Sequence, residues 1–253
     1  MKKRATSFLI IPATLFVFIT VNHGEKSSNH GNKNNKHCVI LLHGLARTES
    51  SMNKMEQALI NEGYHVINKG YPSRSKEIQP LSEETISNAI NECVKFKPGK
   101  IHFVTHSMGG ILVRYYLDKN RIKNLGRVVM LSPPNRGSET VDKLKSFPPF
   151  NWLNGPAGQQ LGTGSKSIPN QIGSPDYEVG IITGDRSINP ILSLLIPGDD
   201  DGKVSIERAK LAGMKDFIVV HNTHTFIMSD KDVIKQVIYF IRNGLFDKST
   251  IKK

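Results

Sequence analysis

The chain has 253 residues and a formal net charge of +12. This length suits one domain with a sizeable core. Its cations are scattered or gathered at the C-terminus and form no basic stripe interleaved with aromatic residues, so the composition argues against nucleic-acid binding. A lysine-rich solvated surface is the simplest interpretation, and attraction to an anionic membrane surface is the alternative.

The N-terminus has the pattern of a targeting segment. Lys2, Lys3 and Arg4 precede an apolar stretch from Phe8 to Val21, which predicts a secretory signal over residues 1–24. No small-x-small cleavage pattern precedes Asn22, so an uncleaved membrane anchor stays open. A polar flexible linker is expected over 25–37. We therefore expect an exported protein, periplasmic or secreted, and anchoring in the membrane through the apolar stretch is the alternative.

From Cys38 onward, apolar runs alternate with amphipathic segments of helix length. Strands are predicted at Val39–Leu42, Val66–Ile67, Ile101–Val104, Val128–Leu131, Val179–Thr183 and Phe217–Val220. Helices are predicted near Ser51–Glu62, Ser82–Phe96, Gly110–Asp118, Val204–Leu211 and Asp232–Asn243. Uniformly apolar strands separated by helices indicate a mostly parallel sheet covered on both faces. We expect one α/β domain over 38–247 and a basic tail over 248–253.

The two cysteines leave two interpretations open. Cys38 opens the first strand, and Cys93 lies late in a helix that ends near the same edge of the sheet. In an exported protein they could form a disulfide, and two buried thiols are the alternative.

A serine turn follows the third predicted strand. Thr105-His106-Ser107-Met108-Gly109 lies between the apolar run and the helix-like stretch beginning at Gly110. Such a turn presents the Ser107 hydroxyl above the carboxyl end of a strand, and the N–H groups of the following helix favour negative charge there. Small neighbours are needed around a strained turn of this kind, and Gly109 meets that need. An ordinary strand-to-helix turn that contains a serine is the alternative.

Two downstream segments supply the partners that a serine nucleophile needs, a general base and a group that orients it. An acidic turn spans Pro197–Ser205, and an apolar strand runs into a histidine loop at Phe217–Phe226. Upstream, the first strand ends in His43-Gly44-Leu45.

From Cys38 to Leu245 these motifs, in this order, resemble lipase- and esterase-like α/β-hydrolases, including triacylglycerol lipases of the His-Gly-Leu type. The resemblance implies the α/β-hydrolase fold with a small cap insertion. It also implies a serine carboxylic-ester hydrolase that acts through an acyl-enzyme on lipid or other apolar esters, without metal or organic cofactor. Thr105 departs from the pattern, because the family has glycine two places before its serine.

By this resemblance Ser107 is the nucleophile, His224 the base and Asp201 the acid. His224 is preferred to His221 because it lies just beyond the strand. Asp201 is preferred to Asp199 because Asp-Gly-x-Val is the usual form of the acid loop.

The remaining roles are assigned in the same way. The other two aspartates of the cluster are expected to be solvated. Asp185 is a reserve position for the acid, although an ion pair with Arg186 is the simpler interpretation. The backbone N–H groups of Leu45 and Met108 are expected to form the oxyanion hole. His43 is expected to hold its own loop, and His102 and His106 to be structural.

The proline- and glycine-rich stretch at about 134–176 is the predicted cap. Its most apolar part, Phe147–Leu153, either lines an acyl-binding pocket or packs the cap onto the domain. So small a cap argues against a preference for long-chain fat presented at an interface.

Two other function classes stay open. An acyltransferase uses the same three side chains, and a non-catalytic binding domain uses the same scaffold. The chain has no nucleotide-binding glycine loop and no metal-ligand spacing. An ester substrate is therefore the only partner that the motifs predict.

Overall fold

The computed structural model describes residues 37–187 and 196–251. The predicted signal or anchor over 1–24 and nearly all of the predicted linker lie outside the described residues. Within the part that is described, no helix is both long enough and apolar enough to cross a membrane.

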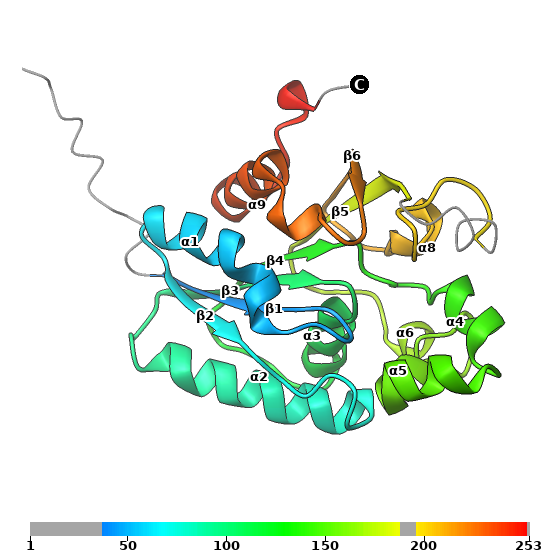
Figure 1. Ribbon diagram of the computed structural model, residues 1–253. Coiled ribbons are helices and arrows are strands. Elements are labelled where there is room, and N and C mark those ends of the chain that lie inside the picture. Colours follow the sequence, from blue (N-terminus) through cyan, green and yellow to red (C-terminus); the bar gives the residue numbers. More distant parts are fainter. Residues whose placement is uncertain (1–36, 188–195, 252–253) are drawn as a thin grey trace, which may run out of the picture. The chain divides into compact units, whose positions relative to one another are not determined.

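The core of the fold is a six-stranded sheet in the order β2-β1-β3-β4-β5-β6 (Figure 1). The strands are β1 (His37–Leu42), β2 (His65–Lys69), β3 (Lys100–His106), β4 (Leu125–Leu131), β5 (Val179–Arg186) and β6 (Asp216–Thr223). Every neighbouring pair is parallel, so all carboxyl ends meet at one edge. The predicted strands and parallel sheet are confirmed. Because β1 and β3 are neighbours, the loops that follow them lie side by side.

Helices cover both faces of the sheet. Helices α2 (Ile78–Val94) and α3 (Met108–Lys119) lie on one face, and α1 (Asn53–Asn61) and α9 (Lys231–Asn243) lie on the other (Figure 1). Alternate side chains of β1 divide between two cores, since Cys38, Ile40 and Leu42 belong to the first and Val39 and Leu41 to the second. This two-sided burial explains why the strands are apolar at successive positions.

Two helices differ from the prediction. Helix α2 begins at Ile78 instead of Ser82, because proline is tolerated in a first turn and Pro80 does not delay the start. Helix α8 (Ile206–Ala209) is a single turn where a longer helix was predicted. The Ser205 hydroxyl accepts from the Arg208 N–H at its start, and the backbone is already extended at Lys210. A short 3-10 segment, η2 (Glu49–Met52), precedes α1.

The segment between β4 and β5 contains three helices, α4 (Glu139–Leu144), α5 (Pro148–Gln159) and α6 (Ile168–Gln171). Prolines occupy the first turns of α5 and α6, where a missing N–H costs nothing. Gly155 breaks α5 with φ of 62°. A Cβ there would lie 2.0 Å from the carbonyl oxygen of Arg74, so the cap backbone is in direct contact with the loop after β2.

The C-terminal segment packs against the domain. After η3 (Ile227–Ser229) and α9, the 3-10 turn η4 (Lys248–Thr250) opens the predicted basic tail. Lys248 Nζ lies 2.8 Å from the Asp216 carboxylate, and Gln236 donates to the carbonyl oxygen of Asp247. The first residues of this tail are therefore attached to the domain.

The two cysteines form a disulfide between β1 and α2, with 55 residues of sequence separation. Both are fully buried. The bond closes a loop that contains the whole β1–α1–β2–α2 unit, so it constrains the unfolded chain over about a fifth of its length.

We predict that reducing this disulfide lowers the free energy of unfolding by up to about 4 kcal/mol, the chain-entropy value for a loop of this size. Urea unfolding of the oxidised and reduced protein, with thiol titration to verify reduction, measures the difference. The double variant Cys38→Ala/Cys93→Ala serves as the control that cannot re-oxidise. Equal unfolding free energies for oxidised and fully reduced protein would contradict the prediction.

His102 is buried in β3, and its Nδ1 accepts the Arg127 N–H at 2.9 Å. Burial, together with the nearby positive charges of His37, Arg127 and Lys100, lowers the pKa of His102 to about 3. The unfolded chain binds this proton below about pH 6.5, whereas the folded chain does not. The free energy of unfolding therefore falls as the pH drops from about 6.5 toward 3.

The variant His102→Gln should flatten this pH dependence, because glutamine keeps an acceptor for Arg127 without titrating. The expected change in slope is up to about 1.4 kcal/mol per pH unit, the value for one proton. Urea unfolding between pH 4 and 7 measures it. An unchanged slope would show that His102 is protonated in the folded state.

Candidate active site

Ser107 is the residue between β3 and α3, with φ of 53° and ψ of −124°. Positive φ is uncommon for a non-glycine residue and marks a strained turn. The Ser107 N–H donates to the Leu131 carbonyl at 2.8 Å, and its own carbonyl accepts from Gly110 at 3.0 Å. The side chain is half-buried at the carboxyl edge of the sheet. The turn thus has the strand–serine–helix form that the sequence predicts.

Glycines allow three chain segments to meet around this serine. A Cβ on Gly109 would lie 2.8 Å from the His43 carbonyl oxygen, and one on Gly44 would lie 3.1 Å from the Ser107 Cβ. Thr105, which replaces the usual glycine, is fully buried. Its hydroxyl lies 3.2 Å from where a Gly110 Cβ would be. Because Gly110 has no Cβ, the Thr105 side chain fits beside it.

His224 connects Ser107 to Asp201. Its Nε2 lies 3.0 Å from the Ser107 Oγ, and its Nδ1 lies 2.8 Å from the Asp201 Oδ2. In this arrangement the serine hydroxyl donates to Nε2 and the Nδ1–H donates to the carboxylate. His224 is the first residue after β6, as the sequence suggests. Its side chain is 4% exposed and that of Asp201 is completely buried.

The turn around Asp201 is built to hold an ionised carboxylate. Asp201 Oδ1 accepts N–H groups from Lys203 at 3.1 Å and Val204 at 2.9 Å. Burial alone would raise the pKa of Asp201, but the charge of His224, its ring hydrogen bond and the Val204 N–H together hold this pKa below its ordinary value. The Asp201 carbonyl also accepts the His224 N–H at 2.9 Å. Acid and base are therefore joined through backbone as well as side chains.

The other candidate acids and the second candidate histidine lie outside the hydrogen-bond chain of Ser107, His224 and Asp201. Asp199 is exposed, as predicted, but the expectation for Asp200 is wrong. Asp200 is buried, and its Oδ1 accepts the Gly202 N–H at 2.6 Å, which shapes the turn. The expected pairing of Asp185 with Arg186 is also wrong, since the Asp185 carboxylate lies 3.0 Å from the His221 Nδ1. His221 is exposed there and does not reach Ser107.

The predicted oxyanion donors follow β1 and Ser107. Met108 is the first residue of α3, so its N–H is one of the free donors of a helix start. Leu45 lies in a loop that Tyr71 secures, because the Tyr71 hydroxyl donates to the His43 carbonyl at 2.5 Å and the two rings stack at 4.1 Å. The His43 Nδ1 lies 2.8 Å from the Gly44 carbonyl. Sequence reasoning assigned no role to Tyr71, which lies beyond β2.

His106 contacts the histidine loop directly. Its Nε2–H donates to the His224 carbonyl at 3.0 Å, and the two rings are 4.9 Å apart. Complete burial, followed by the charges of His224 and Arg47, lowers the pKa of His106 well below its ordinary value. A neutral His106 therefore positions the backbone of the base. This link joins β3 to the segment after β6, and no local sequence pattern signals it.

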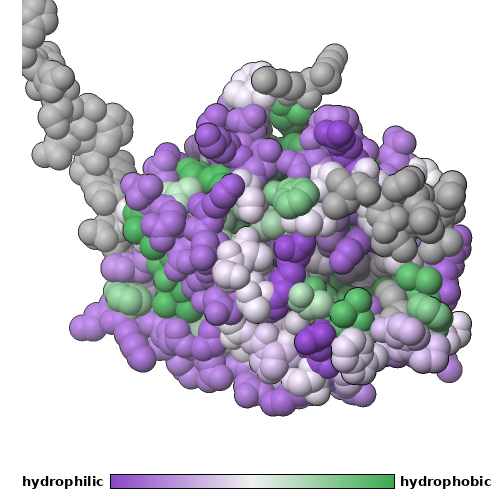
Figure 2. Space-filling model, viewed as in Figure 1, coloured by the Kyte–Doolittle hydropathy of each residue, from purple (hydrophilic) through white to green (hydrophobic). Residues whose placement is uncertain are grey.

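A pocket of about 220 Å³ lies beside Ser107 and His224. Leucine and valine side chains from the β1 loop, the cap and the acid turn form the apolar part of its wall: Leu45, Val141, Leu144, Leu153, Leu161 and Val204. Of the predicted apolar stretch, Leu153 lines this pocket, whereas Trp152 is 82% exposed and borders a neighbouring hollow. Figure 2 shows hydrophobic side chains over the α4–α5 region at the right of the view and a second group at the left, below α1.

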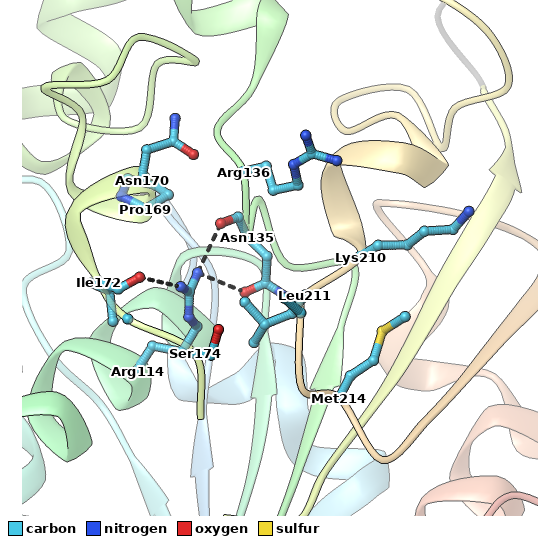
Figure 3. Close-up of a pocket in the computed structure, with 12 residues that line it drawn as sticks. Arg114, Asn135, Arg136, Pro169, Asn170, Ile172, Ser174, Lys210, Leu211 and Met214 are labelled. Carbon is cyan, nitrogen blue, oxygen red and sulfur yellow. Dashed lines mark hydrogen bonds between the residues drawn. The ribbon is translucent and has the colours of Figure 1, made fainter. Parts of the chain in front are cut away.

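A larger hollow of about 500 Å³ has no part in this arrangement (Figure 3). The buried Arg114 donates there to the carbonyl oxygens of Asn135 at 2.8 Å and Ile172 at 3.1 Å. It thereby ties α3 to both ends of the cap. Neither Ser107 nor His224 borders this hollow. Among the described residues no cluster of side chains has the composition of a metal site.

The Thr105–Gly110 contact predicts a specific rescue. Gly110→Ala should lower the free energy of unfolding by about 1 to 3 kcal/mol through overpacking against Thr105 and Pro133, and Thr105→Ala should restore part of it. Gly109→Ala should be more severe and should not respond to Thr105→Ala, because its clash is with the backbone of β1. A double-mutant cycle by urea unfolding tests both. Additive effects of Gly110→Ala and Thr105→Ala would contradict the contact.

Residues 32–152, just under half of the chain, match a protein family described as "Putative serine esterase (DUF676)". No protein with a curated description matches the chain.

Solved structures with the same fold include the mature lipase BlEst2 of Bacillus licheniformis, with a TM-score of 0.68 and 21% identity over 82% of this chain and 92% of that one. Lipase B of Aspergillus fumigatus has a TM-score of 0.56 and 17% identity over 87% of this chain and 56% of that one. A bromoperoxidase of Bacillus anthracis has a TM-score of 0.55 and 14% identity over 82% and 92%.

The TM-scores show a shared fold, and the three names show that the fold alone does not determine the reaction. The family match adds that residues 32–152, which include Ser107 and the β1 loop, are similar to a serine esterase. The predicted resemblance is confirmed: the chain has the α/β-hydrolase fold and is lipase- and esterase-like.

Proposed function

We propose that this protein hydrolyses carboxylic esters through a covalent acyl-enzyme on Ser107. The observation that carries the proposal is the continuous hydrogen-bond chain from Ser107 Oγ through His224 to Asp201, with distances of 3.0 and 2.8 Å. A buried base with an oriented tautomer is what converts a serine hydroxyl into a nucleophile. The apolar pocket beside it suits an acyl group.

In the first half-reaction the Ser107 oxygen attacks the ester carbonyl carbon, and His224 Nε2 takes the hydroxyl proton. The carbonyl oxygen becomes an oxyanion, toward which the N–H groups of Met108 and Leu45 would donate. The bond to the alcohol oxygen then breaks, and His224 returns its proton to that oxygen. The alcohol leaves, and the acyl group remains as an ester of Ser107.

In the second half-reaction a water molecule attacks the acyl-enzyme carbonyl while His224 takes a proton from it. Collapse of the second oxyanion releases the carboxylic acid and returns the proton to Ser107. Throughout, Asp201 stabilises the imidazolium that forms in each half-reaction, and its N–H partners keep it ionised. No other group needs to carry a proton.

Lipid or other apolar esters are the proposed substrates, because the wall of the pocket is mostly apolar. Its volume of about 220 Å³ favours short to medium acyl chains. An acyltransferase would use the same steps with an alcohol in place of water. Added alcohols would then appear in the products as esters, which product analysis distinguishes from hydrolysis.

Export is proposed on two observations. The basic residues before the apolar stretch Phe8–Val21 have the pattern of a secretory signal, and a buried disulfide is typical of proteins that fold in an oxidising compartment. Mass measurement of the N-terminus of the exported protein would decide between a cleaved signal and an anchor.

A p-nitrophenyl ester series of increasing acyl length tests the proposal. We expect hydrolysis of short to medium chains, and a loss of at least about a thousandfold in kcat/KM for Ser107→Ala and His224→Ala. Asp201→Asn should also lose activity, because the carboxylate no longer accepts from Nδ1–H.

Two matched controls sharpen this test. His221→Ala and Asp199→Asn remove the competing histidine and aspartate, which lie outside the hydrogen-bond chain, and should keep activity close to that of the unmodified protein. Retained turnover in Ser107→Ala would reject the proposed function. Strong losses in the control variants would reject the assignment of His224 or Asp201.

A further inference from the structure

Resting on the proposed function, we propose that this site selects esters whose alcohol portion carries a negatively charged group, phosphate or carboxylate, which Arg47 and Lys203 bind. Both residues line the same pocket as Ser107 and His224. The chemical class is thus an anionic ester with an apolar acyl chain.

Each cation is placed by the site itself. Arg47 lies in the loop after β1 that also carries Leu45, and its guanidinium donates to the Thr225 carbonyl at 3.1 Å, next to His224. Lys203 belongs to the acid turn, and its N–H donates to the Asp201 carboxylate. The two side chains therefore come from the two loops that frame the reacting serine.

Among the described residues no ion pair joins Arg47 or Lys203 to a carboxylate, although other cations near the cap, such as Arg208 with Glu139, are paired. The sequence of residues 188–195, which lie outside the description, contains no aspartate or glutamate. Asp201 attracts Lys203, but its carboxylate is bound to His224.

The two cations also act on each other. The side chain of Lys203 is exposed at the pocket, yet desolvation by the surrounding loops, followed by the charge of Arg47, lowers the pKa of Lys203. Desolvation likewise lowers the pKa of Arg47. The charge of Asp201 acts in the opposite direction on the pKa of Lys203 and offsets part of this effect. Like charges beside one hollow raise the free energy of the empty site, and a bound anion relieves this.

Two neighbouring hollows suit the two parts of such a substrate. The leucine and valine wall suits the acyl chain, whereas Arg47 also borders a second hollow of about 530 Å³ that contains Ser73, Arg74 and Ser75. Hydroxyl and guanidinium groups are donors that suit phosphate and carboxylate oxygens. Because Arg47 borders both hollows, an anionic alcohol portion can contact it while the acyl chain occupies the apolar pocket.

A different role for these cations makes a different prediction. If they only stabilised the oxyanion of the transition state, neutral and anionic esters would depend on them equally, because both pass through the same oxyanion. If they instead select an anionic substrate, removing either cation lowers kcat/KM for anionic esters more than for neutral esters.

The experiment compares three soluble esters with the same acyl groups: dibutyroylglycerol, dibutyroylglycerol 3-phosphate and 2,3-dibutyroyloxypropanoate. We expect the unmodified protein to prefer at least one anionic ester. We expect Arg47→Gln and Lys203→Gln each to lower the anionic-to-neutral ratio of kcat/KM by about tenfold, mainly through KM, as for one lost charge contact. Preference for the phosphate over the carboxylate, or the reverse, identifies the group.

Two controls accompany the test. Arg47→Lys keeps the charge and should keep part of the preference. Lys95→Gln removes an exposed cation after the end of α2, beside the amino ends of the strands, and should leave the ratio unchanged. High salt should weaken the preference of the unmodified protein, because it screens exposed charges.

The failures are distinguishable. Ser107-dependent hydrolysis of all three esters with equal preference, or equal losses on all three in the Arg47 and Lys203 variants, overturns this inference and leaves the proposed function standing. If no ester is hydrolysed, the proposed function fails. Calorimetric binding of dibutyroylglycerol 3-phosphate to Ser107→Ala then decides separately whether the site holds the anion, and its absence overturns the inference.

Discussion

The left-handed backbone at Ser107 is the constraint on which the site depends. A non-glycine residue with φ of 53° costs on the order of 1 to 3 kcal/mol, so the surrounding structure has to hold it in place. It does so with the Ser107 N–H bond to β4 and with α3, whose first turns are completely buried. The same tight turn brings the β1 loop against the serine, which only glycine at positions 44 and 109 permits. The positions of Ser107, of the β1 loop and of the start of α3 are thus consequences of one backbone geometry.

His224 is held from three sides, which explains how a loop residue keeps its place. Its carbonyl accepts from His106, its N–H donates to Asp201, and the following residue accepts from Arg47. The low pKa of His106, caused first by burial, keeps that ring neutral. A charged His106 would place a cation 4.9 Å from the His224 ring and would oppose the imidazolium that the proposed mechanism forms. The neutral ring therefore supports both the position and the charge of His224.

The parts of the structure that the sequence predicts well are those set by local patterns. Six strands follow from apolar runs that are buried on both faces. The cap helices were not predicted, because prolines in their first turns and Gly155 inside α5 hide the helical period. Tyr71 and His106 act through partners that are distant in the sequence, the carbonyl oxygens of His43 and His224. Their roles follow from the neighbouring β1 and β3 and from the loops that these strands bring together, which no window of the chain reveals.

Hydrogen bonds attach the cap to the turn that contains Asp201, and these bonds fix the size of the pocket. The Ser138 hydroxyl donates to the Lys203 carbonyl at 2.9 Å, within the turn that holds Asp201. After the end of α5, the Gln160 side chain accepts the N–H of Ile78 at 2.8 Å, which ties the middle of the cap to α2. Since both attachments are short hydrogen bonds to the main body, the pocket wall cannot shift without disturbing the acid turn or the start of α2. The shape of the pocket and the position of Asp201 are therefore coupled through the same few contacts.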